Sequence, residues 1–157
     1  MFRIVFYRPE IPPNTGNAIR LAANTGSELH LVEPLGFSLD AKRLRRAGLD
    51  YGDLTSVRVH ATLDAALAAC EPAAVYAFSA EADRGYATVA FEAGDVLLFG
   101  PESAGLPHDV LHHPRVTDRL RVPMAPGSRA LNLANAASIA VYEAWRQHGF
   151  TGATGGR

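Results

Sequence analysis

Arg121-Val-Pro-Met-Ala-Pro-Gly-Ser-Arg-Ala-Leu-Asn-Leu-Ala-Asn-Ala-Ala-Ser-Ile-Ala-Val-Tyr-Glu-Ala-Trp145 is the stretch on which the fold depends. It predicts the end of a strand, a loop containing Pro123, Pro126 and Gly127, and a helix that runs to about His148. The helix is apolar or small on most of its circumference, so it must be covered on more than one side. We expect its own sheet on one side and a second backbone at close range, that of another subunit, on the other.

Two sets of side chains define this helix. One face carries Leu131, Ala134, Ser138, Val141, Tyr142 and Trp145 at helical spacing, and much of the rest is lined by Leu133, Ala136, Ala137, Ala140 and Ala144. At its entrance, Asn132 and Asn135 place amide groups beside a bent loop. Loops of this kind often bind ligands.

Length and composition predict one cytoplasmic domain. The chain has 157 residues, 48% of them hydrophobic and 20% charged, and a net charge of -1, so its bulk charge does not indicate a nucleic-acid binder. The single cysteine, Cys70, excludes an internal disulfide and a cysteine-rich metal site, which fits a reducing compartment. No secretory signal and no membrane-spanning stretch is evident, so we expect no membrane association. A single domain is predicted over 1–150, followed by a flexible tail over 151–157.

Strands and helices alternate along the chain. Strands are expected at 2–7, 28–32, 57–60, 74–79, 95–99 and 119–122, and helices at 14–25, 40–46, 63–70 and 108–113, before the last helix. Asn14 and Thr62 are expected N-caps, and Gly26 is expected to end the first helix. This alternation predicts an α/β fold with a mainly parallel sheet flanked by helices.

A glycine-rich loop, Leu98-Phe-Gly-Pro-Glu-Ser-Ala-Gly-Leu-Pro107, follows a buried strand. Gly100 and Gly105 have the spacing of a phosphate-binding P-loop, but Leu106-Pro107 replaces the Lys-Ser/Thr pair, and no dinucleotide fingerprint is present. The loop can still bring backbone groups close to a flat ligand, with the Glu102 carboxylate beside it. The alternative is a tight turn without a ligand.

Two polar clusters are further candidates. Asn14 and Arg20 in the first helix could converge on an anion, or they could be a simple cap and a surface arginine. A basic segment carries Lys42, Arg43, Arg45 and Arg46, which suit a phosphate backbone near a cleft but are more often a solvated face. His108-Asp-Val-Leu-His112 is similar to a zinc-protease pattern, but it has the shorter acid and no obvious third ligand, so we expect no metal.

Three motifs resemble those of the SPOUT methyltransferases, and more narrowly those of the small tRNA 2′-O-methyltransferases that modify the wobble nucleotide of the anticodon. They are Pro9-Glu-Ile-Pro-Pro-Asn-Thr-Gly-Asn-Ala-Ile-Arg20, Phe99-Gly-Pro-Glu-Ser-Ala-Gly-Leu-Pro107, and Arg121-Val-Pro-Met124 followed by Leu131-Asn132. Lys42-Arg-Leu-Arg-Arg-Ala-Gly-Leu-Asp-Tyr51 and Val141-Tyr-Glu-Ala-Trp-Arg-Gln147 also resemble this subgroup. The resemblance covers nearly the whole chain apart from the tail.

The resemblance implies a C-terminal part threaded into a deep trefoil knot, which topology rules alone would argue against. It also implies a homodimer, with Tyr142 in or near the contact, and S-adenosylmethionine as methyl donor, with S-adenosylhomocysteine as product. The implied donor-binding positions are Phe78, Gly100, Gly105, Val122, Ala130, Leu131 and Leu133, and the implied catalytic positions are Asn14, Arg20, Glu102 and Asn132. The family often has a serine where this chain has Ala130, so either Ser128 substitutes for the hydroxyl or the contact is dispensable.

The resemblance also implies tRNA as substrate and no metal. A guanidinium stays charged, so we expect Arg20 to fix a phosphate and to stabilise negative charge on the 2′-oxygen. Glu102 or an RNA phosphate oxygen would take the proton. The alternatives are a methyltransferase for another tRNA position or for ribosomal RNA, and a non-enzymatic RNA-binding factor.

Overall fold

The computed structural model describes residues 1–38 and 56–154. Within these residues the centre of the molecule is a seven-stranded sheet of order β3-β2-β1-β6-β4-β7-β5, in which all neighbouring strands are parallel. The strands are β1 (Arg3–Tyr7), β2 (Glu28–Val32), β3 (Val57–His60), β4 (Val75–Phe78), β5 (Arg84–Gly85), β6 (Val96–Phe99) and β7 (Asp118–Arg121). The prediction of an α/β fold with a mainly parallel sheet is confirmed. The trefoil knot stays a prediction.

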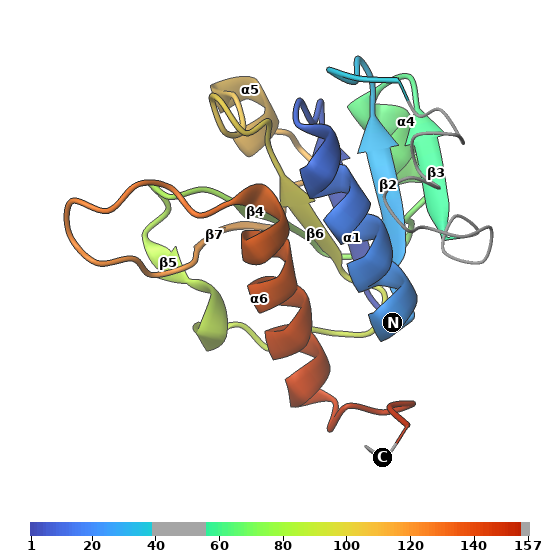
Figure 1. The fold of residues 1–157 in the computed structure, drawn as a ribbon. Coiled ribbons are helices and arrows are strands. Elements are labelled where there is room, and N and C mark those ends of the chain that lie inside the picture. Colours follow the sequence, from blue (N-terminus) through green and yellow to red (C-terminus); the bar gives the residue numbers. More distant parts are fainter. Residues whose placement is uncertain (39–55, 155–157) are drawn as a thin grey trace.

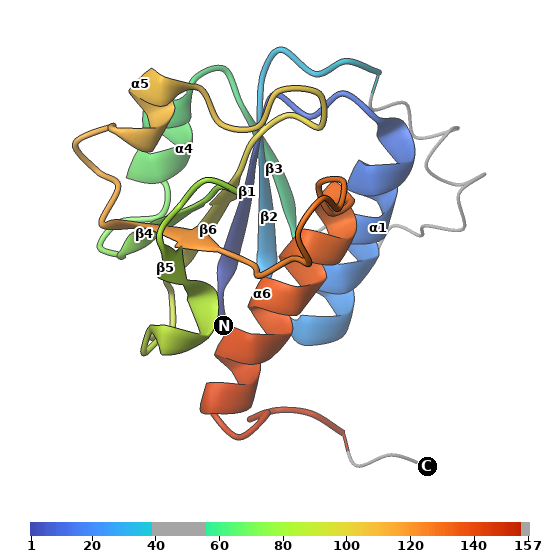
Figure 2. The same ribbon diagram turned by 90° about the vertical axis from the view of Figure 1, so that its left-hand side faces the viewer.

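Helices cover both faces of the sheet (Figures 1 and 2). The two long helices, α1 (Pro12–Thr25) and α6 (Leu133–Gln147), lie side by side on one face, and the short helices α4 (Leu63–Ala68) and α5 (His108–Leu111) lie on the other. None of the described helices is long and apolar enough to cross a membrane.

The core divides into two clusters because successive side chains of a strand point to opposite faces. In β1, Ile4 and Phe6 pack beneath α1 and α6, whereas Val5 and Tyr7 pack beneath α4 and α5. The central strands are therefore buried on both faces, and their continuous apolar runs follow from that position.

The start of α1 corrects one expectation. Asn14 was expected to be the N-cap, but the helix begins at Pro12 and Ile11 occupies the N-cap position without a side-chain hydrogen bond. Two prolines are tolerated here because the first N–H groups of a helix have no partner within the helix. Asn14 is instead a buried residue of the first turn, 4% exposed. At the other end, Gly26 closes α1 in the left-handed conformation, as expected.

The packing of α6 corrects a second expectation. Its buried stripe is formed by Leu133, Ala134, Ala137, Ala140, Val141 and Ala144. Tyr142, which was expected in or near a dimer contact, lies outside this stripe and is 45% exposed. The second backbone at close range to the small residues is that of α1 in the same chain, since both helices contribute to one core cluster.

The helix predicted at 40–46 lies outside the described residues, and the remaining boundaries within them differ only locally from those expected. The strand predicted at 119–122 lies one residue earlier, and the helices predicted at 63–70 and 108–113 end at Ala68 and Leu111. Thr62 caps α4 as predicted, by accepting a hydrogen bond from the N–H of Ala65 at 3.2 Å. The short strand β5 and the 3₁₀ turn Tyr86–Thr88 that follows it were not anticipated.

A polar cluster lies within the sheet at β2 and β3. His30 is fully buried, and its Nδ1 lies 2.9 Å from Nε2 of His60. Its Nε2 lies 3.4 Å from the Glu28 carboxylate. Burial lowers the pKa of both histidines. This burial favours the neutral form of the pair, in which one ring can donate to the other.

An aromatic group lies at the carboxyl end of α6. Trp145 packs edge-on against Tyr142 at 5.8 Å and against Phe150 at 5.4 Å between ring centroids. The Trp145 indole N–H donates to the carbonyl of Thr151 at 3.0 Å. Tyr142 and Phe150 are both exposed, so this end of the helix presents apolar surface to its surroundings.

Candidate active site

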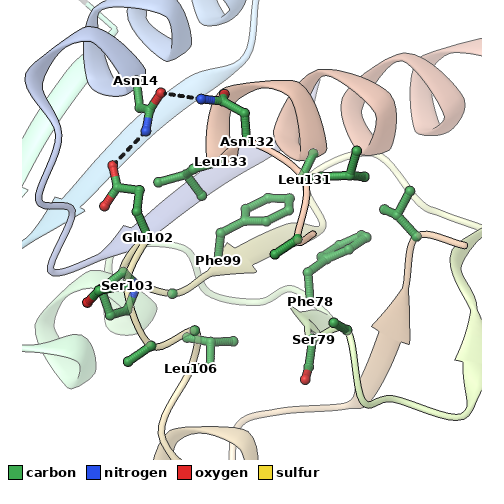
Figure 3. A pocket seen from close by; sticks show the side chains of 18 of the residues that line it. Asn14, Phe78, Ser79, Phe99, Glu102, Ser103, Leu106, Leu131, Asn132 and Leu133 are labelled. Atoms are coloured by element: carbon green, nitrogen blue, oxygen red, sulfur yellow. Dashed lines mark hydrogen bonds between the residues drawn. The ribbon is translucent and has the colours of Figure 1, made fainter. Parts of the chain in front are cut away.

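A cavity of about 570 Å³ lies at the carboxyl ends of β4 and β6 and just beyond β7. Ligands of parallel α/β sheets bind at this edge, because the strand ends and the loops that follow them leave a crevice there. The walls come from the loops after these three strands, the start of α1 at Ile11 and Asn14, Leu111 of α5, and the entrance of α6 (Figure 3). This size lies in the usual range for small-molecule sites, roughly 300 to 1,000 Å³.

One wall of the cavity is aromatic. Phe78 ends β4, Phe99 ends β6, and their rings stack at 4.6 Å between centroids with 18° between the ring planes. Leu106, Leu131 and Leu133 complete the apolar lining (Figure 3). A flat apolar group would be well packed against these side chains.

The structure brings the predicted donor-binding positions together. All seven line this cavity, namely Phe78, Gly100, Gly105, Val122, Ala130, Leu131 and Leu133. Phe99 also lines the cavity, although it was not among the predicted donor-binding positions. Its position as the last residue of a buried strand, directly before the glycine-rich loop, is the signal that could have identified it.

The two glycines of the loop have different physical roles. A Cβ on Gly100 would lie 2.3 Å from the backbone carbon of Gly105 and 2.3 Å from the backbone nitrogen of Leu106, so the loop closes on itself at this point. Gly105 has a φ of +68°, and a Cβ at this position would meet no atom within 4 Å. Gly100 thus permits close contact within the protein, and Gly105 permits a left-handed turn beside the open cavity.

Three predicted catalytic residues form one chain of hydrogen bonds (Figure 3). The Asn14 side-chain amide donates to Glu102 Oε1 at 2.9 Å, and the Asn132 amide donates to Asn14 Oδ1 at 2.8 Å. The Asn132 oxygen in turn accepts the N–H of Asn135 at 3.2 Å, which makes Asn132 the N-cap of α6. Each donor and acceptor in this chain fixes the orientation of the next amide group.

Glu102 accepts hydrogen bonds from two further donors. The backbone N–H groups of Glu10 and Ile11 donate to its two oxygens at 2.7 and 3.1 Å. The carboxylate therefore lies at the N-terminus of α1, where the helix dipole favours negative charge. With three donors around it, Glu102 joins the glycine-rich loop to the start of α1.

Other predicted residues lie elsewhere. Arg20 is exposed on α1 and does not line the cavity. Ser128 does not line it either, because its hydroxyl donates to the carbonyl of Ala125 within the loop. The predicted RNA-binding residues Lys42, Arg43, Arg45 and Arg46 lie outside the described residues.

The two histidines of the zinc-protease-like pattern contact each other rather than a third ligand. The rings of His108 and His112 stack at 4.0 Å between centroids, and His112 Nε2 lies 2.7 Å from a guanidinium nitrogen of Arg119. Over residues 1–38 and 56–154 there is no group of three or more His, Cys, Asp or Glu side chains suited to a metal ion.

Relatives among known proteins cover nearly the whole chain. The SpoU rRNA Methylase family matches residues 1–142. A tRNA (cytidine(34)-2′-O)-methyltransferase of Saccharophagus degradans is 55% identical over 152 residues, 97% of this chain and 99% of that protein. A solved structure concerned with the 2-OH methylation of C/U34 on tRNA has a TM-score of 0.86 at 47% identity, and the match covers 95% of this chain and 97% of that one. The SpoU methyltransferase AviRb of Streptomyces viridochromogenes, solved with AdoMet, has a TM-score of 0.76 at 28% identity, and covers 93% of this chain and 57% of that one.

Proposed function

Because this chain belongs to the SpoU rRNA Methylase family, we propose that it is a tRNA 2′-O-methyltransferase. It transfers a methyl group from S-adenosylmethionine to the ribose 2′-hydroxyl of the wobble nucleotide at position 34. This agrees with the 55% identical relative, which is named a tRNA (cytidine(34)-2′-O)-methyltransferase. The observation that carries the proposal is the cavity beside the glycine-rich loop, which the seven positions predicted for the donor all line.

The residues of the cavity fit S-adenosylmethionine. The stacked rings of Phe78 and Phe99 and the leucines opposite them suit the adenine ring, and the backbone of the Gly100–Gly105 loop supplies polar groups at the cavity wall. When bound, S-adenosylmethionine would supply an activated methyl group, with S-adenosylhomocysteine as the leaving group when the 2′-oxygen attacks the methyl carbon. The protein must then align the hydroxyl and stabilise the charge that develops on it. We propose that no metal takes part.

We assign substrate contacts to Arg20. A guanidinium group has no free acceptor for a proton, so Arg20 does not serve as a base. It binds a phosphate of the RNA and stabilises negative charge on the 2′-oxygen, because its fork of donors matches both groups. Arg20 lies outside the donor cavity, so its removal should affect the substrate and not the donor.

Asn14, Glu102 and Asn132 hold the start of α1, the glycine-rich loop and the start of α6 together beside the donor. Because three donors already surround the Glu102 carboxylate, an RNA phosphate oxygen is the better candidate for accepting the proton. The role of Glu102 is then to position its neighbours.

We also propose that the enzyme works as a homodimer in the cytoplasm. The exposed aromatic group around Tyr142 supports a contact there, and the buried free thiol of Cys70 suits a reducing compartment. Pairing two chains doubles the phosphate contacts available from Lys42, Arg43, Arg45 and Arg46, and such contacts add up along an RNA. Light scattering at micromolar concentration should give a dimer, and Tyr142→Glu should shift it toward monomer. A stable monomer of the unmodified chain would overturn this arrangement.

The substrate is tested with radiolabelled S-adenosylmethionine and separate pools of total tRNA and ribosomal RNA. Label should enter tRNA alone, and mapping of 2′-O-methyl groups in RNA from a strain without the protein should show a loss at the wobble nucleotide. Label in ribosomal RNA would identify a different RNA methyltransferase. Failure to bind the donor at millimolar concentration would identify an RNA-binding factor without activity.

A further inference from the structure

Two glutamates exchange hydrogen bonds across the start of α1. Glu102 accepts the backbone N–H groups of Glu10 and Ile11, as described above. In return, the Glu10 carboxylate accepts the backbone N–H of Ser103 at 3.0 Å and its hydroxyl at 2.8 Å. Two segments about ninety positions apart in the sequence are thus joined in both directions.

The segment around Glu10 is held from its other side as well. The N–H of Gly36 donates to the carbonyl of Pro9 at 2.9 Å. A Cβ on Gly36 would lie 2.8 Å from the Cα of Glu10, so the loop after β2 is in close backbone contact with this residue. The Glu10 carboxylate therefore projects from a well-fixed backbone and can help to hold the Ser103 segment in place.

The glycine-rich loop that Glu10 contacts forms part of the wall of the donor cavity. Residues 100–106 all line that cavity, whereas Glu10 does not. The N–H of Gly105 donates to the carbonyl of Pro101 at 2.9 Å, which makes the segment between them a single turn. A displacement of Ser103 is consequently transmitted through this turn to the cavity wall.

We propose that Glu10 is a positioning residue for the methyl-donor site, and that it acts through Ser103 on the glycine-rich loop. This role rests on the proposed function, since it concerns the same cavity. Glu10 touches neither donor nor substrate and takes no part in proton transfer. Its loss should weaken donor binding and raise the KM for S-adenosylmethionine, with little change in kcat at saturation.

The test compares Glu10→Ala with Glu10→Gln. Alanine removes both acceptors, and we expect about a tenfold weaker binding of S-adenosylhomocysteine by calorimetry. Glutamine can accept the Ser103 N–H with its oxygen and donate its amide to the hydroxyl, so its affinity should stay within about threefold of wild type. Glu33→Ala is the matched control, because Glu33 is exposed at the end of β2 and makes no side-chain hydrogen bond to any described residue.

Ser103→Ala provides an independent measurement. It removes one of the two donors and should weaken donor binding by about threefold. In the Glu10→Ala background the same change should add almost nothing, because the two residues act through one contact. Additive losses, or wild-type affinity in Glu10→Ala, would overturn this role of Glu10. Absence of binding by the wild-type chain would overturn the proposed function, and the role of Glu10 with it.

Discussion

Replacing Gly100 by alanine would place a methyl group where the backbone of the loop already lies. The new Cβ would be 2.3 Å from two backbone atoms of Gly105 and Leu106 and 2.7 Å from the carbonyl oxygen of Gly105. Carbon atoms in contact are separated by about 3.5 Å, so the Gly105–Leu106 backbone must move by roughly 1 Å. Because backbone cannot rotate aside as a side chain can, we expect a cost at the upper end of overpacking, about 3 kcal/mol.

The same displacement should affect donor binding, since both displaced residues line the cavity. We expect the affinity for S-adenosylhomocysteine to fall at least tenfold, which corresponds to about 1.4 kcal/mol. Guanidinium chloride unfolding followed by circular dichroism measures the loss of folding stability, and titration calorimetry measures the loss of affinity for S-adenosylhomocysteine.

Gly105→Ala is the control for Gly100→Ala. It meets no atom within 4 Å, so its cost should be limited to the strain of its positive φ, about 1 to 2 kcal/mol. If Gly100→Ala were as stable as wild type to within about 0.5 kcal/mol and bound the donor equally well, the reasoning from close backbone contact would be refuted.

Three further predictions concern catalysis, metal and pH. Arg20→Ala should keep donor affinity within a few-fold and lower methyl transfer to tRNA by about a hundredfold or more. Arg20→Lys should restore little of this activity, because a point charge lacks the fork of donors. Loss of donor binding in Arg20→Ala would instead make Arg20 structural. Donor binding and activity should both persist in a strong chelator, and loss of either would reveal a metal. Burial lowers the pKa of His30 and His60, so below about pH 6.5 the unfolded chain binds protons that the folded chain does not. The free energy of unfolding should therefore fall as the pH is lowered from that value, by at most about 1.4 kcal/mol per pH unit for His30, until the folded-state pKa is reached. His30→Gln should flatten this slope, and an unchanged slope would contradict the assignment.

Elements with a strong local pattern are predictable from this sequence. The strands at 28–32 and 57–60 were predicted with the bounds that the structure gives them, because each is a short run between turn residues. Thr62 was predicted to cap α4 because capping depends on one side chain and a backbone group three residues away.

The start of α1 shows why other features were not predictable. Local rules favour Asn14 as the cap, but the helix starts at Pro12, and the acceptor at its N-terminus is supplied by Glu102 from the loop after β6. No sequence window contains both partners. The same holds for the role of Glu10, which depends on a contact with Ser103 that only the fold creates.

In the candidate site, too, the local motifs were predictable from the sequence and the contacts between distant segments were not. The glycine-rich loop, Asn14 and Asn132 were identified from motifs, and their contact with one another became visible only in the folded chain. Arg20 belongs to the same motif as Asn14, but it is exposed and lies outside the cavity that Asn14 lines. Neighbouring positions in a motif therefore do not have to reach the same cavity.

Trp145 is the only tryptophan in the sequence, so the intrinsic fluorescence of the protein has a single indole source. That indole lies between Tyr142 and Phe150 and is hydrogen-bonded to Thr151, so its emission reports on the carboxyl end of α6 alone. If Tyr142 lies in a dimer contact, simple dilution of the unlabelled enzyme should shift the emission to longer wavelength as subunits separate. With Tyr142 in that contact, the single indole would serve as an optical probe of association that requires no dye and no added residue.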